Sequence, residues 1–407
     1  MYSPRPRKRI LRPGQVRSTN NAAILQLLRQ RQPLSRAEIA RATGLTEGTI
    51  SRITAGLMDR GIVVEEGAEN STGGRPAIRL RLDNRRFLSI GVDILNWETH
   101  IAVGTLSGQL LETNCFRTPE TPEETIGAVA REVQRIRPRY RGATFVGIGV
   151  TARGLVNSDT GVVELGNDAH WVGIPVREML EAKTSLPVKV ENDVRAAALA
   201  EYEHGSAEVQ SSHTLLFVKV GEGVGMGIVL DGRLYRGPNM AAGEMGQMIL
   251  ADGVGEGPHD SPGCLEKLAS NFATSERYAR LMGGRSRSTP GDSAAQVKRV
   301  CHLAASGDAK AIAALRATSR YLGLGIANAV WLLNADVVVI DGALTEAWGT
   351  VSAAIREQFP AGDAFANFRG LMLRPSSLSG RATIVAAVGL PFASWFSQSA
   401  EMRAAGD

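Results

Sequence analysis

Residues 242–268, AGEMGQMILADGVGEGPHDSPGCLEKL, concentrate side chains of the kinds that hold metals or small ligands. The segment contains acids, an amide, one histidine and one cysteine, all set among glycines. A structural zinc site needs four Cys or His ligands in a tetrahedral arrangement. His259 and Cys264 are the two such residues that this segment offers. Its composition is therefore typical of a site that has lost some of its ligands.

A second group of polar side chains follows residue 45. In residues 47–61, EGTISRITAGLMDRG, the apolar Ile50, Ile53 and Leu57 share one helical face, and Thr46 can cap the helix. The opposite face is slim and carries donors, which a helix needs to enter the major groove of DNA. The residues predicted to contact DNA are Thr46, Gly48, Thr49, Ser51 and Arg52, together with Arg75 in the loop that follows.

Neighbouring elements support this prediction. Residues 20–31 have helical spacing of apolar side chains, and a short helix follows between the N-cap Ser35 and the terminator Gly44. The short turn after Gly44 gives the pattern of a helix-turn-helix. Residues 62–83 then read as two alternating strands around a glycine-containing loop, which predicts a β-hairpin wing. Arg75 in that loop is placed to reach a minor groove.

The distribution of charge agrees with a separate nucleic-acid-binding module. The whole chain has 407 residues and a net charge of +5. Residues 1–60 carry +9 and the remainder −4, so the basic character is local. A disordered basic tail is the alternative explanation of charge alone, but it accounts for neither the capped helices nor the wing.

Several other classes of protein are disfavoured. The most membrane-like run, residues 321–340, is interrupted by Asn328, Asn334 and Asp336 and reads as a helix followed by a buried strand. The basic N-terminus has no apolar run behind it, so we expect no secretory signal and a cytoplasmic protein. Three scattered cysteines argue against a disulfide framework.

The body contains an internal duplication. Residues 87–116 and 214–237 each read as three strands joined by a Gly or Asp turn and then by a tight hairpin, Ser107-Gly108 in one copy and Asp231-Gly232 in the other. Helical and β-rich stretches follow each triplet. This order predicts two α/β lobes with a cleft between them.

Four motifs in the body make a more specific resemblance visible: VENDVRAAALAEYEHG, VKVGEGVGMGIVLDGRLYRG, AGEMGQ and GCLE. In order and spacing they resemble the ROK family of repressors, open reading frames and sugar kinases. The winged helix resembles that of the family's transcriptional repressor branch. The resemblance covers essentially the whole chain after residue 18. It implies a two-lobed, ribonuclease-H-like body of the actin and sugar-kinase type, with the sugar in the cleft.

The resemblance also implies a sugar-binding set: Asn167, Asn192, Asp193, Glu244, Gln247 and Glu266. Asp193 stands where the kinases of the family keep the base that deprotonates the attacking hydroxyl. Carboxylates and amides suit a neutral polyol because each hydroxyl both donates and accepts hydrogen bonds.

The nucleotide-binding turns depart from the family's kinase pattern. The first turn of the kinases carries Asp-x-Gly-Gly-Thr, whereas this chain has Asp93 followed by Ile, Leu95, Asn96 and Trp97. In the second turn, Glu222 stands where a threonine usually contacts phosphate. Bulk and negative charge in a phosphate cradle oppose nucleotide binding, so the sequence predicts no ATP binding and no kinase activity.

Zinc is also disfavoured. Zinc-bearing members supply one His and three Cys, and the corresponding positions here are Gln247, Gly257, His259 and Cys264. His259 and Cys264 remain as weak candidates, and we expect neither a metal nor another cofactor.

These observations predict a DNA-binding transcriptional regulator, expected to act as a repressor, with a sugar or related small molecule as effector. We expect it to bind double-stranded operator DNA as a homodimer. The alternatives are a carbohydrate kinase with an accessory head and a ligand-independent DNA-binding regulator. The expected domains are a disordered arm (1–17), the winged helix (18–83), a first actin-like lobe (84–205), and a second lobe with a helical insertion (206–407).

Overall fold

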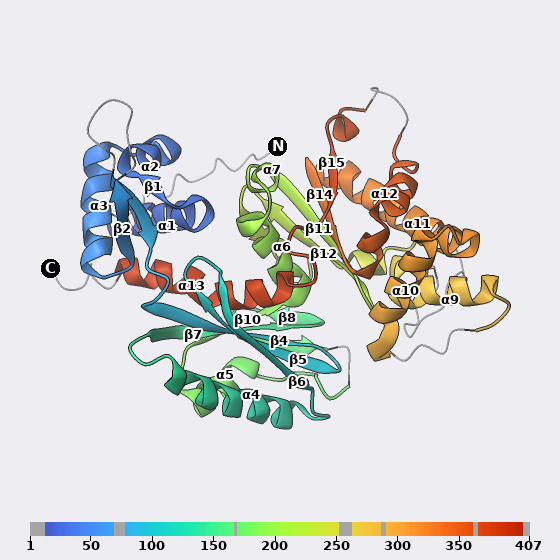
Figure 1. Cartoon of the computed structure of the whole chain (residues 1–407), viewed down its shortest axis with the longest axis horizontal. Helices are drawn as coiled ribbons and strands as arrows, with labels where there is room; N and C mark the ends of the chain where they lie inside the picture. The colour runs from blue at the N-terminus through green and yellow to red at the C-terminus, as the bar shows by residue number, and fades with distance from the viewer. Residues whose placement is uncertain are drawn as a thin grey trace, which may run out of the picture.

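The computed structural model describes residues 13–68, 78–166, 169–251, 263–285, 290–360 and 365–401. Figure 1 shows a small amino-terminal head beside a body of two lobes, and each lobe is built on a five-stranded sheet. Within the described ranges, every helix is too short or too polar to cross a bilayer.

The head is a winged helix, as predicted. Its elements are α1 (Pro13–Arg31), β1 (Leu34–Ser35), α2 (Arg36–Thr43), α3 (Glu47–Asp59), β2 (Val63–Ala68) and β3 (Ile78–Leu82). Ser35 and Glu38 form the capping box that starts α2, and Gly44 ends the helix with a left-handed φ of 69° that glycine adopts without strain. The wing strands β2 and β3 pair antiparallel.

One boundary of the head differs from the expectation. Helix α1 begins at Pro13, inside the range 1–17 that we expected to be a disordered arm. Proline suits the first position of a helix because its φ is already helical and its missing N–H would have no partner there.

The two lobes repeat one topology. The first contains β4 (Phe87–Ile94), β5 (Glu98–Thr105), β6 (Leu110–Arg117), α4 (Pro122–Ile136), β7 (Thr144–Ala152), β8 (Leu155–Asn157), β9 (Val162–Leu165), α5 (Val176–Thr184), β10 (Val188–Asn192), α6 (Asp193–His204) and α7 (Ala207–Gln210). The second contains β11 (Thr214–Val220), β12 (Val224–Leu230), β13 (Arg233–Tyr235), α8 (Leu265–Ala269), α9 (Asn271–Leu281), α10 (Ser293–Ala305), α11 (Ala309–Leu333), β14 (Val337–Asp341), α12 (Trp348–Arg356), β15 (Met372–Pro375) and α13 (Ala382–Glu401).

The sheet orders are β6-β5-β4-β7-β10 and β13-β12-β11-β14-β15. In both sheets the first three strands of this order pair antiparallel with their neighbours. The fourth strand then pairs in parallel with the third, and the fifth pairs in parallel with the fourth. The predicted duplication is therefore confirmed. It places the β4–β5 turn and the β11–β12 turn at equivalent positions.

The last long helix of each half packs on the sheet of the other half. Helix α6 follows the first sheet but lies against β11 and β12, while α13 follows the second sheet but lies against β4 and β7. The expected division at residue 205 therefore does not describe the packing, because α13 belongs with the first lobe. Gly91 in β4 permits this close contact, since a Cβ there would lie 2.7 Å from the Val388 backbone nitrogen.

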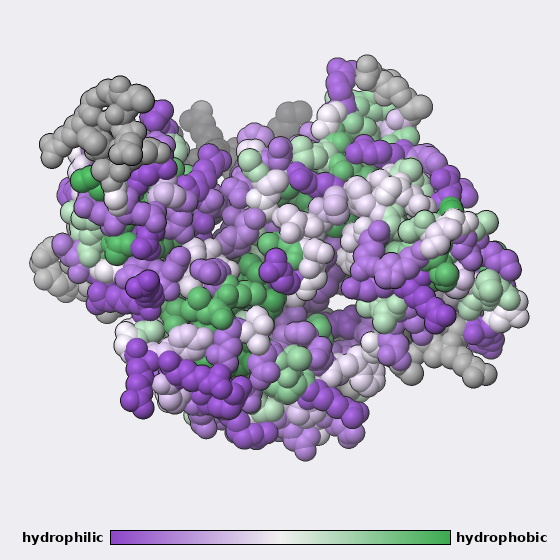
Figure 2. Space-filling model, in the orientation of Figure 1, coloured by the Kyte–Doolittle hydropathy of each residue, from purple (hydrophilic) through white to green (hydrophobic). Residues whose placement is uncertain are grey.

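The head docks on the same helix. Helix α1 packs against α13, and the apolar core of the head continues into Val388, Phe392 and Phe396 of α13. In the space-filling view, apolar surface lies where α13 runs between the head and the first lobe (Figure 2). The head and the first lobe thus share one hydrophobic cluster instead of being joined by a bare linker.

Candidate functional site

The predicted DNA-binding residues of α3 lie together on its outer side. Gly48, Ser51 and Arg52 are exposed, while Thr49 is half-buried. Thr46 is exposed, and its hydroxyl accepts a hydrogen bond from the Thr49 backbone nitrogen at 3.3 Å, so it caps the helix as predicted. Ile50, Ile53 and Leu57 are buried on the inner side. Arg75 falls outside the described residues.

Acidic partners hold several other arginines of the head. Arg36 ties α2 to the wing through an ion pair with Glu65 at 3.2 Å. On the wing, Arg79 and Arg81 each pair with a glutamate of α2 or β2. These arginines stabilise the arrangement of helices and wing, and Arg52 is left as a basic group on the exposed face of α3.

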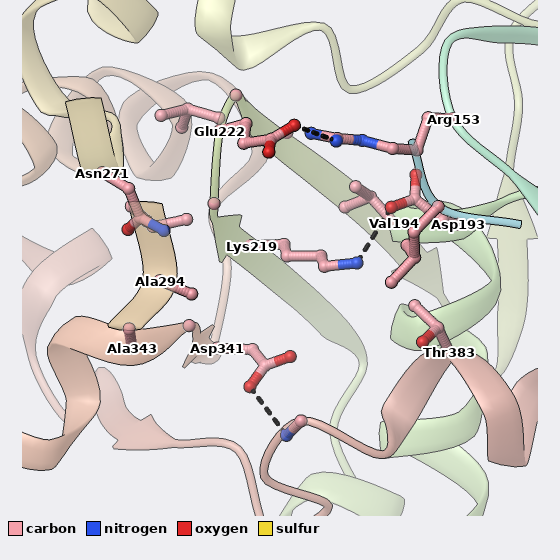
Figure 3. A pocket seen from close by; sticks show the side chains of 18 of the residues that line it. Arg153, Asp193, Val194, Lys219, Glu222, Asn271, Ala294, Asp341, Ala343 and Thr383 are labelled. Atoms are coloured by element: carbon pink, nitrogen blue, oxygen red, sulfur yellow. Dashed lines mark hydrogen bonds and ion pairs between the residues drawn. The ribbon is translucent and has the colours of Figure 1, made fainter. Parts of the chain in front are cut away.

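A cleft of about 620 Å³ lies between the two lobes. Its walls are the β4–β5 turn (residues 95–97), the β11–β12 turn (residues 221–223), and the first residues of α6 and α13. Figure 3 shows Asp193, Lys219, Glu222 and Arg153 pointing into this space from both lobes. The topology explains this arrangement, because equivalent turns of two duplicated sheets face each other across the cleft.

Asp193 and Lys219 form an ion pair in the cleft. Asp193 begins α6 and is 5% exposed, and its Oδ2 atom accepts a hydrogen bond from Lys219 Nζ at 2.9 Å. Burial alone would raise the pKa of Asp193, but the charges of Lys219 and Arg153 outweigh it and hold this pKa below its usual value. Burial lowers the pKa of Lys219, yet Asp193 and Asp93 raise it further, so its net shift is upward. Both groups are therefore charged at neutral pH.

Asp93 lies deeper, at the end of the first sheet. Its two carboxylate oxygens accept hydrogen bonds from Thr151 at 2.8 Å and from Thr383 of α13 at 2.6 Å. Burial raises the pKa of Asp93 although Lys219 opposes the shift. Asp93 therefore connects the cleft to the start of α13.

Four of the predicted sugar-binding residues line the cleft: Asn192, Asp193, Glu244 and Glu266. The Glu266 carboxylate accepts a hydrogen bond from the Val224 backbone nitrogen at 3.0 Å, and Glu244 also lines the cleft but stays accessible to solvent. The cleft walls around Glu244 partly remove its carboxylate from water and so raise its pKa; the nearby Glu266 and Asp193 add to the shift, and the charge of Arg195 opposes it.

The other predicted positions fare differently. Asn192 is the N-cap of α6: its Oδ1 accepts from the backbone nitrogens of Val194 and Arg195, and its Nδ2 donates to Gly154. Its polar atoms are thus occupied, which gives it a structural role in positioning Asp193. Gln247 is exposed and is not among the residues that line the cleft. Asn167 falls outside the described residues.

The Glu222 carboxylate bridges the two lobes. Its Oε2 atom accepts a hydrogen bond from Arg153 of the first lobe at 2.5 Å (Figure 3). The same oxygen accepts a second hydrogen bond from Asn96, also of the first lobe, at 3.1 Å. Trp97 of the first lobe adds a further contact, because its indole ring lies close to Gly291 of the second lobe. A Cβ placed on Gly291 would lie 3.2 Å from this ring. Instead of leaving a free negative charge, the substitution at Glu222 places a paired carboxylate between the two turns.

The metal candidates do not come together in the described part of the chain. Cys264 is buried and precedes α8, where its backbone pairs with Ile249. His259 and Gly257 fall outside the described residues, and the exposed amide of Gln247 is a poor ligand for zinc. The donor set therefore does not fit a structural zinc ion, and the absence of a metal stays a prediction.

Two cleft residues were missed by the sequence analysis. Lys219 sits within the apolar strand VKV, and a lone charge in a buried strand was the signal that could have identified it. Arg153 directly follows β7, where the carboxyl end of a strand meets the cleft. Trp171 packs against the core of the first lobe.

Comparisons with known proteins agree with this architecture. The ROK family model matches residues 89–385, and the model of the IclR helix-turn-helix domain matches residues 20–67. The DNA-binding transcriptional dual regulator NagC of Escherichia coli is 32% identical over 340 residues, or 82% of each chain. The xylose repressor of Caldicellulosiruptor bescii is 26% identical, over 92% of this chain and 96% of that protein.

Solved structures give the same result. A ROK family transcriptional regulator described as a homolog of the E. coli MLC protein superposes with a TM-score of 0.77 and 25% identity, over 96% of this chain and all of that chain. A ROK family glucokinase from Streptomyces griseus, in complex with glucose and AMPPNP, reaches a TM-score of 0.63 with 26% identity, over 74% of this chain and 98% of that chain. The chain therefore belongs to the ROK family, in its branch of transcriptional repressors with an amino-terminal helix-turn-helix domain.

Proposed function

We propose that this ROK-family protein binds operator DNA through α3 and the wing, and that its cleft binds a neutral sugar as effector without any nucleotide. The observation that carries the proposal is the cross-cleft bridge of Glu222 with Arg153 and Asn96. It fills the space between the two turns with protein groups but leaves Asp193, Glu244 and Glu266 facing the cleft.

A sugar suits the remaining groups. The ionised Asp193 and the carboxylates at the mouth accept hydrogen bonds from hydroxyls, and Lys219 donates. The relatives are named for N-acetylglucosamine and xylose, and the glucokinase structure contains glucose, so these three sugars are the first to test.

Phosphoryl transfer is disfavoured by the same bridge. A nucleotide would need backbone N–H groups free to wrap its phosphates, and the Glu222 carboxylate stands in that space. Arg153, a cation that phosphates would attract, is already paired. The rival proposal, a carbohydrate kinase, rests on Asp193, which keeps the position of the family's base.

A homodimer is the expected operator-binding form. One head buries a small surface on DNA, and paired heads that read two half-sites raise both affinity and specificity. Helix α11 buries one part of its surface in the second lobe, but Trp331 and Leu332 near its end are 42% and 79% exposed. Light scattering coupled to size exclusion tests the dimer.

Fluorescence titration tests the cleft. Trp97 lines it and is half exposed, so sugar binding should change the tryptophan emission, and the Trp97→Phe variant should lose that change. N-acetylglucosamine, xylose and glucose are each titrated with and without AMPPNP. We expect saturation by one sugar and no influence of AMPPNP. Silence with all three sugars would favour the ligand-independent regulator, and turnover of ATP with any of them would favour the kinase.

A further inference from the structure

Helix α6 runs from the cleft to the head. Its first residue, Asp193, pairs with Lys219 in the cleft, and Glu203 near its end pairs with Arg29 of α1 at 2.9 Å. Twelve helical residues span about 18 Å, so one continuous helix connects the candidate effector site with the DNA-binding domain. Figure 1 shows α6 between the two lobes, with α13 beside it.

The Arg29 side chain lies in a small buried site, the Arg29 socket, which is formed by Glu203, His204 and Gly389. Arg29 is 6% exposed, and its ion pair with Glu203 has side-chain exposures of 4% and 12%. Gly389 of α13 makes the approach possible, because a Cβ there would lie 2.6 Å from Arg29 Nη2. An arginine buried this deeply keeps its place only while its carboxylate partner stays in register, since an unpaired buried charge is costly.

His204 adds no competing charge to this socket. Burial, together with the positive charge of Arg29, lowers the pKa of His204 to about 3, so the ring is neutral under ordinary conditions. Its Nε2 atom has no hydrogen-bond partner among the described residues. Glu203 is therefore free to serve Arg29 as its counterion.

The middle of α6 is closely packed on two sides, so we expect the helix to move as a rigid unit. A Cβ on Gly227 of β12 would clash with Ala198, so this strand lies very close to α6. On another side, Ala196 and Ala200 pack against Val385 and Ala386 of α13. Small side chains on both sides leave no slack to absorb a displacement, and tightly packed elements shift between discrete positions instead of deforming.

We propose that α6 reports the state of the cleft to the head, and that the Arg29 socket is the contact through which the head receives it. A ligand hydroxyl that hydrogen-bonds to Asp193 and moves its carboxylate away from Lys219 displaces the first turn of α6. Because the helix moves as a unit, Glu203 at its other end moves too, and the ion pair between Glu203 and Arg29 breaks or forms. The packing of α1 against the body changes as a result. This inference rests on the proposed function, because it assigns the route by which an effector acts on the operator-binding head.

A double-mutant cycle tests the route without sugar or DNA. Asp193→Asn alters the cleft end of α6, and Gly389→Ala crowds the guanidinium of Arg29 while adding a better helix former. Hydrogen exchange of the α1 amides, residues 20–31, is measured by mass spectrometry on the full chain. We expect Asp193→Asn to change their exchange rate by about threefold or more, and to change it little in the Gly389→Ala background.

Equal changes in the two backgrounds, or no change in α1 with Asp193→Asn, would overturn the proposal. Unaltered exchange in α4, which lies away from α6 in the first lobe, shows that each variant is folded, and Arg29→Met replaces Gly389→Ala in the cycle if the latter does not fold. Because the cycle uses no ligand, its failure is distinct from failure of the proposed function, which the sugar titration measures separately.

Discussion

The carboxylate of Glu222 lies 2.5 Å from the guanidinium of Arg153, and this contact joins the second lobe to the first across the cleft. In the kinases that the chain resembles, the two turns on either side of this contact surround nucleotide phosphates. In this chain the Glu222 carboxylate lies between the two turns. Protein groups therefore connect the two turns, and we propose that the cleft binds its ligand without a nucleotide.

We predict that Glu222 and Arg153 are energetically coupled. Their side chains are 23% and 18% exposed, so the pair is screened less than a surface ion pair. A cycle of Glu222→Gln and Arg153→Met, followed by urea unfolding, should give a coupling free energy of about 1 to 2 kcal/mol. The control is Glu357→Gln, which breaks the exposed pair with Arg316 and should cost less than about 0.5 kcal/mol. Additive effects at Glu222 and Arg153 would show that the bridge is not stabilising.

Arg52 is predicted to carry DNA affinity. It is exposed on the outer face of α3, and its replacement by alanine should weaken binding to an operator duplex by about tenfold or more. If the contact is to a phosphate, the slope of affinity against salt should also fall by about one. Arg320→Ala, an exposed arginine of α11, is the matched control and should leave binding unchanged. Fluorescence anisotropy measures both variants.

Asp193→Asn should weaken sugar binding. A hydrogen bond from a sugar hydroxyl to a charged carboxylate is stronger than one to a neutral amide. We therefore expect the variant to lose about ten- to a hundredfold in affinity. The pKa of Asp193 is held low, so this carboxylate stays charged and should itself add no pH dependence to the affinity between pH 8 and 5. Glu208→Gln, at an exposed acid of α7 that pairs with Arg374, serves as control. Calorimetric titration would contradict the assignment if both variants bind alike.

Acid should destabilise the protein through His204. The pKa of this residue is about 3 in the folded chain and 6.5 when unfolded, so the unfolded chain binds the extra proton in between. The contribution of neutral His204 to the free energy of unfolding is therefore complete above pH 6.5 and decreases as the pH falls toward 3. At pH 5 the loss is about 2 kcal/mol. His204→Gln should flatten the dependence of unfolding free energy on pH. His213→Gln should not flatten it, because Asp231 raises the pKa of that exposed ring.

Close packing of α13 on the first sheet predicts a large effect at Gly149. A Cβ there would clash with the Ala387 carbonyl oxygen, so Gly149→Ala should lower the unfolding free energy by about 1 to 3 kcal/mol. Gly349→Ala lies in α12 with no atom within 4 Å of the new methyl group and should instead be neutral or stabilising. Similar stabilities of the two variants would contradict the packing described for α13.

Local patterns identified most of the architecture. The capping box of Ser35, the helical face of Ile50 and the repeated strand triplets depend on neighbours in sequence, and all are found as predicted. Contacts between distant segments could not be read in this way. The exchange of α6 and α13 between the lobes and the pairing of Arg29 with Glu203 depend on tertiary packing alone. Asn192 shows a further limit, because the same residue type serves as a helix cap or as a sugar contact.

We propose that one chain joins an operator-binding head to a sugar-binding cleft that works without nucleotide. The measurement that decides this is the affinity of the full-length protein for a duplex from its own promoter region, measured by anisotropy with and without saturating N-acetylglucosamine, xylose or glucose. We predict specific binding that one of these sugars changes by about five- to a hundredfold, with or without AMPPNP. An affinity that no sugar alters, or that changes only when AMPPNP is present, would contradict it.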